Sequence, residues 1–233
     1  MKPGSAEVTV SVIIAVYNHA NYLGEAIDSA LTQEGVDPEI VVVDDGSDDG
    51  SADVARNFEP RVHIESQQRA GSGAARNHGV GVSSGEFIAF LDADDRFAPG
   101  KLAAQLERFF AEPAPDAVFG HVREFISPEL DAEAAAAVRA PSEPGPSHLL
   151  GAMLIRREVF ERVGPFNVDL KLRQGVDWYA RAVDAGLRET MLDRVVLERR
   201  LHTTNSGLRE AGTQDQYMLS AIRAALDRRR AQP

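Results

Sequence analysis

The sequence predicts an α/β fold with a mainly parallel central sheet, and three observations support this fold class. Apolar segments rich in β-branched residues alternate with segments whose apolar residues recur at helical spacing. Glycine, proline, asparagine and aspartate gather between these segments, where turns are expected. The run Phe87–Leu91 is apolar without interruption, which is typical of a strand buried on both faces. Strands separated by helices in this way pair in parallel through right-handed crossovers.

The first hundred residues are predicted to hold strands connected by helices in regular alternation. The first strand is rich in β-branched residues and ends at Tyr17-Asn18-His19. In the helix after it, apolar residues recur in pairs along one stripe. The strands are expected at residues 8–16, 39–43, 61–65 and 87–91, and the helices at 22–31, about 51–58 and 73–82.

The second half of the chain is less regular, and we expect it to belong to the same domain, spanning residues 1–233, because no linker or repeat divides the sequence. Residues 127–147 hold several prolines and the run Ala134–Ala137, so they are predicted to form a Pro/Ala-rich surface loop. Helices are predicted at 101–110, 157–163 and 176–185, strands at 117–119 and 194–201, an ordered segment at 149–155 and a further helical pattern at 214–230.

The composition excludes several classes of function. A formal net charge of -11 argues against a nucleic-acid-binding protein, which needs a basic surface. The sequence has no cysteine, so a metal site must use oxygen or imidazole ligands. We find no signal sequence and no apolar stretch of about 20 residues, the length that spans a bilayer, and we therefore expect a cytoplasmic protein. Arg228–Arg230 is interpreted as a solvated helix end, with peripheral contact to anionic lipid at the inner membrane face as the alternative.

Three carboxylates directly follow the apolar run at residues 87–91. Asp92, Asp94 and Asp95 would repel one another there unless a positive charge lay between them, and a hard divalent cation commonly fills that place. The alternative is a turn whose aspartates cap the next helix. Both hypotheses stay open on these residues alone.

Two further loops combine turn residues with groups suited to a nucleotide. In Asp44-Asp45-Gly46-Ser47, a carboxylate can accept hydrogen bonds from a base or ribose, or can bond to its own backbone in a turn. Gly71–Gly79 opens a helix with glycines and places Arg76 in its first turns, which suits a diphosphate; the alternative is a plain helix start with a solvated arginine. The glycine fingerprint of dinucleotide-binding folds and the P-loop are both absent from the sequence.

The loops after residues 16, 43 and 91 all leave the carboxyl ends of predicted strands. If these strands are neighbours, the loops converge on one rim of the sheet. Parallel sheets bind their ligands at this rim, so we expect the carboxylates of two of these loops to share a site.

The order of the motifs resembles that of the family 2 glycosyltransferases, which have the GT-A fold, a Rossmann-like sheet flanked by helices. The match is densest over residues 8–100 and continues more thinly afterwards. The motifs, in order, are Val12-Ile13-Ile14-x-x-Tyr17-Asn18, Val43-Asp44-Asp45-Gly46-Ser47-x-Asp49-Gly50, Ala75-Arg76-Asn77-x-Gly79 and Gly85-Glu86-x-Ile88-x-Phe90-Leu91-Asp92-x-Asp94-Asp95, followed by Val163-Gly164-x-Phe166, Asp177-Trp178 and Arg200-x-His202.

The resemblance implies a donor site for a nucleoside-diphosphate sugar, with a UDP-sugar as the expected donor. Asp44 and Asp45 match family positions that contact base and ribose, and Arg76 matches the position near the diphosphate. Asp92-Ala93-Asp94 resembles the DXD motif, which binds ribose and holds a Mg²⁺ or Mn²⁺ ion through Asp94. Donor contacts are also implied for Ala15, Tyr17 and Asn18.

The same resemblance implies an acceptor side in residues 101–233, with the donor in residues 8–100. Asp177 matches the catalytic base, which would take the proton of an acceptor hydroxyl as it attacks the anomeric carbon, and this single displacement gives inversion. Trp178 would lie near the acceptor, and His202 near the metal or diphosphate. The ion would neutralise charge on the departing diphosphate. The acceptor is expected to be a glycan, a lipid-linked molecule or a protein.

Two positions depart from the family pattern and motivate alternatives. Ala15 stands where the family commonly has proline, and Val176 where it usually has glutamate. The second change favours, as an alternative, a catalytically impaired module that binds nucleotide-sugars; a nucleotidyltransferase is a further alternative.

The second-half residues also have structural interpretations that need no resemblance. Asp177 fits the first turn of a helix, Trp178 fits a core and His202 fits a structural histidine. No spacing among the other histidines requires a site, and we interpret them as structural: His19, His63, His78, His121 and His148.

Overall fold

The computed structural model describes residues 8–202 apart from positions 112, 132, 134, 136–139, 142 and 171. The helical pattern expected at 214–230, with Arg228–Arg230, lies outside the described residues. Within them, a mixed sheet has the strand order β3-β2-β1-β4-β8-β6-β9-β5, and β7 pairs with β6. The α/β fold class is confirmed.

The first half forms the parallel part of the sheet. Its helices and strands from β1 to β4 were all predicted, and their ends differ from the prediction by two residues at most. β1 pairs in parallel with β2 on one side and β4 on the other, so the three chemically important loops do leave one rim. The elements are β1 (Val10–Val16), α1 (Ala20–Leu31), β2 (Glu39–Asp44), α2 (Ser51–Arg56), β3 (His63–Ser66), α3 (Ser72–Val82) and β4 (Phe87–Asp92).

The second half extends the sheet with strands of mixed direction. The predicted helices appear as α4 (Lys101–Phe109), α6 (Arg157–Val163) and α7 (Gln174–Asp184). β8 (Leu154–Arg156) pairs antiparallel with β4 and with β6 (Ala117–Ile126), while β9 (Glu189–Leu201) runs parallel to β6. A short 3₁₀ turn, η1 (Leu150–Ala152), precedes β8.

Three parts of the second half differ from the prediction. β6 continues to Ile126 and β9 begins at Glu189, because the two strands pair along their lengths through a bulge near His121. β5 (Arg96–Phe97) was not predicted and pairs with β9. β7 (Gly145–Ser147) lies in the segment expected to form a surface loop, so that expectation is wrong at its end, where backbone pairing with β6 fixes the chain.

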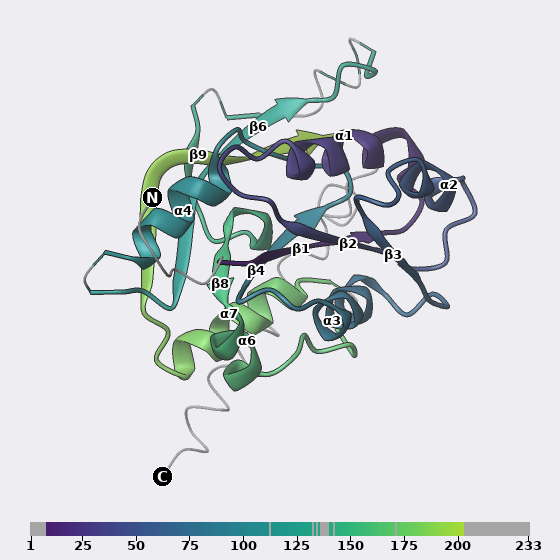
Figure 1. Ribbon diagram of the computed structural model, residues 1–233. Coiled ribbons are helices and arrows are strands. Elements are labelled where there is room, and N and C mark those ends of the chain that lie inside the picture. Colours follow the sequence, from purple (N-terminus) through teal and green to yellow (C-terminus); the bar gives the residue numbers. More distant parts are fainter. Residues whose placement is uncertain are drawn as a thin grey trace.

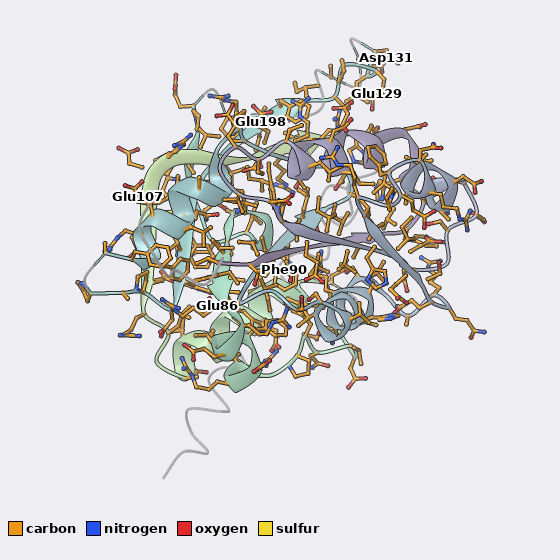
Figure 2. The ribbon with its side chains drawn as sticks, viewed as in Figure 1. Glu86, Phe90, Glu107, Glu129, Asp131 and Glu198 are labelled. Carbon is orange, nitrogen blue, oxygen red and sulfur yellow. The ribbon has the colours of Figure 1, made fainter. Side chains whose placement is uncertain are left out.

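Helices cover both faces of the sheet and create two apolar cores (Figure 1). Alternate residues of β1 point to opposite faces: Val12 and Ile14 pack with α1 and α4, whereas Ile13 packs toward α3, α6 and α7. Phe90 lies at the centre of the molecule and Glu107 at its edge (Figure 2). The cores hold the sheet rigid behind the rim. Among the described residues, no helix has the length and apolar character that a membrane span requires.

Candidate functional site

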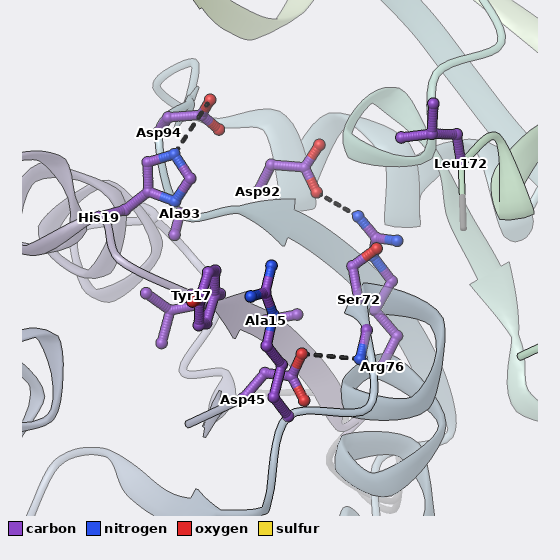
Figure 3. A pocket seen from close by; sticks show the side chains of 13 residues that line it. Ala15, Tyr17, His19, Asp45, Ser72, Arg76, Asp92, Ala93, Asp94 and Leu172 are labelled. Atoms are coloured by element: carbon purple, nitrogen blue, oxygen red, sulfur yellow. Dashed lines mark hydrogen bonds and ion pairs between the residues drawn. The ribbon is translucent and has the colours of Figure 1, made fainter. Parts of the chain in front are cut away.

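A cavity of about 340 Å³ opens at the carboxyl ends of β1, β2 and β4 (Figure 3). This is the rim that the sequence predicts. Its walls come from the three loops, from the start of α3 and from Leu172. The lining includes Ala15, Val16, Tyr17, His19, Asp45, Arg69, Gly71, Ser72, Arg76, Asp92, Ala93 and Asp94.

One end of this cavity is built around Asp45. Its carboxylate is 4% exposed and accepts hydrogen bonds from the backbone N–H groups of Ala70 and Gly71, both at 2.8 Å, and from Gln67 Nε2 at 2.7 Å. These bonds tie β2 to the loop before α3. The Arg69 guanidinium lies over the Tyr17 ring, 3.9 Å from its centroid. The result is a flat, polar wall with a fixed carboxylate.

Asn18 and Asp44 support this loop rather than line the cavity. Among the described residues, the cavity wall includes Asp45 and Tyr17 but neither of these two. Asp44 accepts the Ser47 N–H at 3.1 Å, which is the turn interpretation of that segment. Asn18 exchanges hydrogen bonds with Asp48 and has a positive φ of 55°. Asn18 therefore joins the loops after β1 and β2, and Asp44 stabilises the turn within its own loop.

Arg76 and Asp92 form an ion pair in the middle of the cavity. Arg76 Nη2 lies 2.6 Å from Asp92 Oδ1. The arginine is 8% exposed and is held by α3, while the Asp92 side chain is half-exposed. A guanidinium fixed in this way presents its remaining N–H groups in one direction, as recognition of phosphate oxygens requires.

At the other end of the cavity, Asp94 lies between two histidines. His202 Nε2 is 3.0 Å and His19 Nε2 is 4.0 Å from Asp94 Oδ2. Burial raises the pKa of Asp94, but the hydrogen bond with His202 and the charge of His19 outweigh it, so the pKa lies below its ordinary value. The ionised carboxylate and the imidazoles are suitable metal ligands.

Asp95 supports the loop beside this group, and one of its carboxylate oxygens lies within 4.8 Å of oxygens of Asp92 and Asp94. It accepts the Arg200 N–H at 2.8 Å, and its own N–H donates to the Asp92 carbonyl. Burial, reinforced by the charges of Asp94 and Asp92, raises the pKa of Asp95 well above its ordinary value. The turn of the alternative hypothesis is present at residues 93–94, but the aspartates do not cap the next helix, because α4 begins only after Gly100.

A second cavity of about 370 Å³ shares Ser72, Arg76, Asp92 and Leu172 with the first. The start of α7 forms its far wall, where Val176 is 45% exposed. The lining further includes three aliphatic side chains, a histidine, a glycine and three charged residues, namely Leu149, Leu150, Leu197, His148, Gly151, Asp95, Arg173 and Arg199. A ligand in this cavity would touch a ligand in the first.

Asp177 and Trp178 lie behind the wall of the second cavity. Among the described residues, the α7 positions that line it are Gln174, Gly175 and Val176. Asp177 is 5% exposed, and its Oδ2 accepts a hydrogen bond from Arg181 Nε at 3.0 Å. Asp177 thus occupies the first turn of α7, as its structural interpretation expects.

Trp178 is a core residue, which corrects the expected acceptor contact. Its side chain is fully buried and stacks on Phe160, with ring centroids 5.5 Å apart. The indole N–H donates to the Gly164 carbonyl at 2.9 Å. Packing against α6 leaves no ring surface for an acceptor.

Sequence reasoning missed several residues of the two cavities. His19 and His148 were interpreted as structural but line a cavity each. Arg69, Ser72 and Leu172 were not singled out. The one available signal was the position of His19, directly after Tyr17-Asn18 at the carboxyl end of β1.

Curated relatives match somewhat less than half of the chain. The succinoglycan biosynthesis protein ExoO of Rhizobium meliloti is 46% identical over 111 residues, which are 47% of this chain and 32% of that protein. An uncharacterized glycosyltransferase of Nostoc sp. is 45% identical over 104 residues, 43% of this chain and 32% of that protein. The matched regions thus span about a third of the length of these relatives.

Solved structures share the fold over most of the chain. Residues 1–349 of S. aureus TarS in complex with UDP-GlcNAc superpose with a TM-score of 0.66 at 18% identity, covering 85% of this chain and 60% of that one. The mannosyltransferase PcManGT from Pyrobaculum calidifontis, in complex with GDP-Man and Mn²⁺, gives 0.64 at 24% identity, covering 92% and 64%. These likenesses establish a GT-A fold.

The family assignment rests on a match that spans strands, loops and cavity together. The family model for "Glycosyl transferase family 2" matches residues 11–168, which is more than half of the chain and includes the Asp45, Arg76 and Asp92–Asp94 segments. The chain therefore belongs to glycosyl transferase family 2.

Proposed function

We propose that this protein transfers a sugar from a nucleoside-diphosphate sugar to an acceptor hydroxyl with inversion, and that it requires a divalent metal ion. The observation that carries the proposal is the convergence of Asp45, Arg76 and Asp94 on one cavity at the carboxyl ends of parallel strands. A fixed carboxylate, a buried guanidinium and a candidate metal site are the groups that a nucleoside, a diphosphate and its counter-ion need.

The donor would lie along the first cavity, with its nucleoside toward Asp45 and its diphosphate toward Arg76. TarS and PcManGT have been solved with UDP-GlcNAc and with GDP-Man, which supports a nucleotide-sugar here, and a UDP-sugar is our first choice. Arg76 would neutralise charge on the departing diphosphate. Ala15, Tyr17, Asp92 and Ala93 line the same space and are proposed to contact the donor.

Asp94 and His202 would hold the metal ion, Mg²⁺ or Mn²⁺. These two side chains are suitable metal ligands, because an ionised carboxylate and an imidazole nitrogen lie 3.0 Å apart beside the open cavity. When bound, such an ion supplies Lewis-acid stabilisation of the leaving diphosphate. The Mn²⁺ in PcManGT supports this choice for a protein of the same fold.

The second cavity is proposed to take the acceptor, so that the donor belongs to residues 8–100 and the acceptor to residues 101–233. Asp177 remains our proposed general base, and its place one residue behind the cavity wall requires that its bond to Arg181 open when the acceptor binds. The burial of Asp177, together with Val176 at the wall, favours a second candidate, a nucleotide-sugar-binding module without turnover.

Incubation with a panel of UDP-, GDP- and dTDP-sugars and Mn²⁺ tests the proposal. We expect release of nucleoside diphosphate from one donor, accelerated by the correct acceptor. Binding without release would support the binding module, and release of pyrophosphate would support a nucleotidyltransferase. A matched Asp94→Asn variant should lose the metal-dependent part of donor binding.

A further inference from the structure

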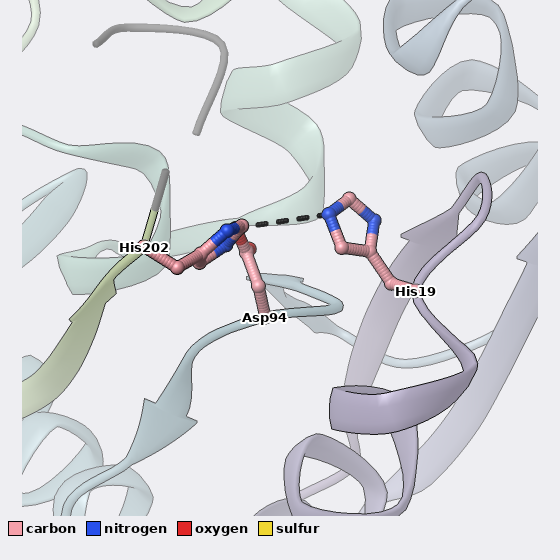
Figure 4. Close-up of side chains that lie close together, drawn as sticks. All are labelled: His19, Asp94 and His202. Atoms are coloured by element: carbon pink, nitrogen blue, oxygen red, sulfur yellow. Dashed lines mark hydrogen bonds and ion pairs between the residues drawn. The ribbon is translucent and has the colours of Figure 1, made fainter. Parts of the chain in front are cut away.

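We propose that His19 is a third protein ligand of the metal, and that the resulting set of two imidazoles and one carboxylate selects Mn²⁺ over Mg²⁺. This inference rests on the proposed function, because it concerns the ion of the same cavity. His19, Asp94 and His202 come from three distant parts of the chain: the loop after β1, the loop after β4 and the residue after β9 (Figure 4).

The spacing of the three side chains suits one shared ion. One ligand atom from each lies within 4.8 Å of the other two. Ligands at about 2.1 Å from an ion are about 3.0 Å apart at right angles and about 4.2 Å apart when opposite. The separations of 3.0 Å and 4.0 Å from Asp94 Oδ2 fall in this range. The second separation is also longer than a hydrogen bond, so the His19 imidazole faces the carboxylate without bonding to it directly.

The backbone of His19 is fixed independently of its ring. Its N–H donates to Ser51 Oγ at 3.1 Å, and its carbonyl accepts the N–H groups of Tyr22 and Leu23 at the start of α1. The imidazole makes no capping hydrogen bond to that helix. The ring is therefore held near Asp94 by its backbone, while its side chain is not required for folding of the helix start.

The two neighbouring carboxylates, Asp92 and Asp95, already interact with other groups of the protein. Asp92 pairs with Arg76, and Asp95 is buried and accepts the Arg200 N–H. The Tyr22 ring packs on the His202 ring with centroids 4.9 Å apart, and this contact fixes the plane of the His202 imidazole. His19 and Asp94 both line the cavity, so an ion held here keeps an open side toward the proposed diphosphate.

The ligand types determine which ion is preferred. Mg²⁺ keeps water and takes carboxylate and phosphate oxygens, whereas imidazole nitrogens suit divalent transition metals. If only Asp94 and His202 bound the ion, the affinities for Mg²⁺ and Mn²⁺ would differ less. The second imidazole shifts the preference toward Mn²⁺.

Titration of the full chain with Mn²⁺ alone, followed by the electron paramagnetic resonance signal of free Mn²⁺, tests the assignment. We expect His19→Ala to weaken Mn²⁺ binding about tenfold and to leave Mg²⁺ binding, measured by competition, nearly unchanged. Pulsed measurements should detect nitrogen couplings from two histidines in the wild type and from one in the variant. His63→Ala, at an exposed histidine of β3, is the matched control and should match the wild type.

The outcomes separate this inference from the proposed function. Unchanged Mn²⁺ affinity and two remaining nitrogen couplings in His19→Ala would overturn the role of His19 while leaving a metal held by Asp94 and His202. If the wild type binds no Mn²⁺, or if Asp94→Asn has no effect, the metal site of the proposed function fails and the inference with it. His19→Gln, with its circular dichroism spectrum compared with that of the wild type, guards against loss of folding.

Discussion

The ion pair of Arg76 and Asp92 shows how single residues organise the cavity. A guanidinium that is 8% exposed needs a partner, because an unpaired buried charge is strongly unfavourable. Asp92 supplies that partner at 2.6 Å and stays half-exposed itself. The pair thus keeps a positive group inside a strongly acidic protein at the place where a diphosphate is proposed to bind.

Asp92→Asn should lower donor affinity about tenfold, because Arg76 loses its charged partner and its fixed orientation. Calorimetric titration with the donor that the panel identifies is the measurement. Asp193→Asn is the matched control, since the Asp193 side chain is fully exposed on β9 and its variant should bind like the wild type. Equal affinity in both variants would mean that Asp92 does not position Arg76.

Asp177→Asn should reduce transfer at least about a hundredfold while donor affinity stays within about twofold, because the amide keeps the contact with Arg181 but cannot accept a proton. Initial rates and donor titrations measure the two effects separately. Near-normal turnover would show that Asp177 has only a structural role at the start of α7.

The sequence predicts those site residues that belong to a local motif. Asp45 and Asp94 follow strand ends, Asp92 ends β4 and Arg76 lies in the first turns of α3, and all four line the cavity. Arg69 could not be found, and for His19 only its position after Tyr17-Asn18 was a signal, because the partners of both side chains come from other loops. Trp178 was placed near an acceptor although packing against α6 buries it, since a sequence position does not reveal which side of a helix meets a neighbour.

At the scale of elements, the placement of α3 against the sheet determines where Arg76 lies. A Cβ atom at Gly79 would come within 2.4 Å of Ile13 Cγ2 and 3.2 Å of Val43 Cγ2. The absence of a side chain therefore lets the helix approach β1 and β2 closely, and the first turns of the same helix then reach the cavity.

Gly79→Ala should destabilise the protein by about 1–3 kcal/mol, because α3 must move away from β1. Gly81→Ala in the same helix meets no atom within 4 Å, so it should be neutral or stabilising by up to about 1 kcal/mol. Urea unfolding of both variants measures the difference. Equal free energies of unfolding would contradict the close packing of α3.

The element α4 carries a buried lysine that makes stability depend on pH. Burial lowers the pKa of the Lys101 ammonium to about 7. In the unfolded chain the pKa is about 10.4, so between these values the unfolded state binds more protons and stability rises with pH by up to about 1.4 kcal/mol per unit. Lys101→Met should remove this rise between pH 7 and about pH 10, as measured by urea unfolding. An unchanged slope would show that Lys101 is charged in the folded state.

The elements themselves are predicted well where local pattern and burial agree. β1, β2 and β4 are apolar and deeply buried, so their positions follow from the sequence. β6 and β9 exceed their predicted lengths because the added parts include polar residues that are partly or fully exposed, as at Glu124 and Asp193. The lengths of these two strands depend on their pairing with each other, and the local sequence of either strand does not reveal this pairing.

At the scale of the whole molecule, the fold places two cavities on one rim with a shared wall. The parallel half supplies most of the first cavity, and α7 supplies the far wall of the second. Arg76 and Asp92 belong to both, so two ligands would meet at this pair. The arrangement suits a reaction between a bound donor and a bound acceptor.

The most direct test of the central claim is a crystal structure with the donor and Mn²⁺, combined with anomalous scattering from the manganese. The account predicts nucleotide density in the first cavity, with the base end near Asp45, the diphosphate beside Arg76, and one manganese peak at Asp94. Nucleotide density outside that cavity, or a manganese peak away from Asp94, would contradict it.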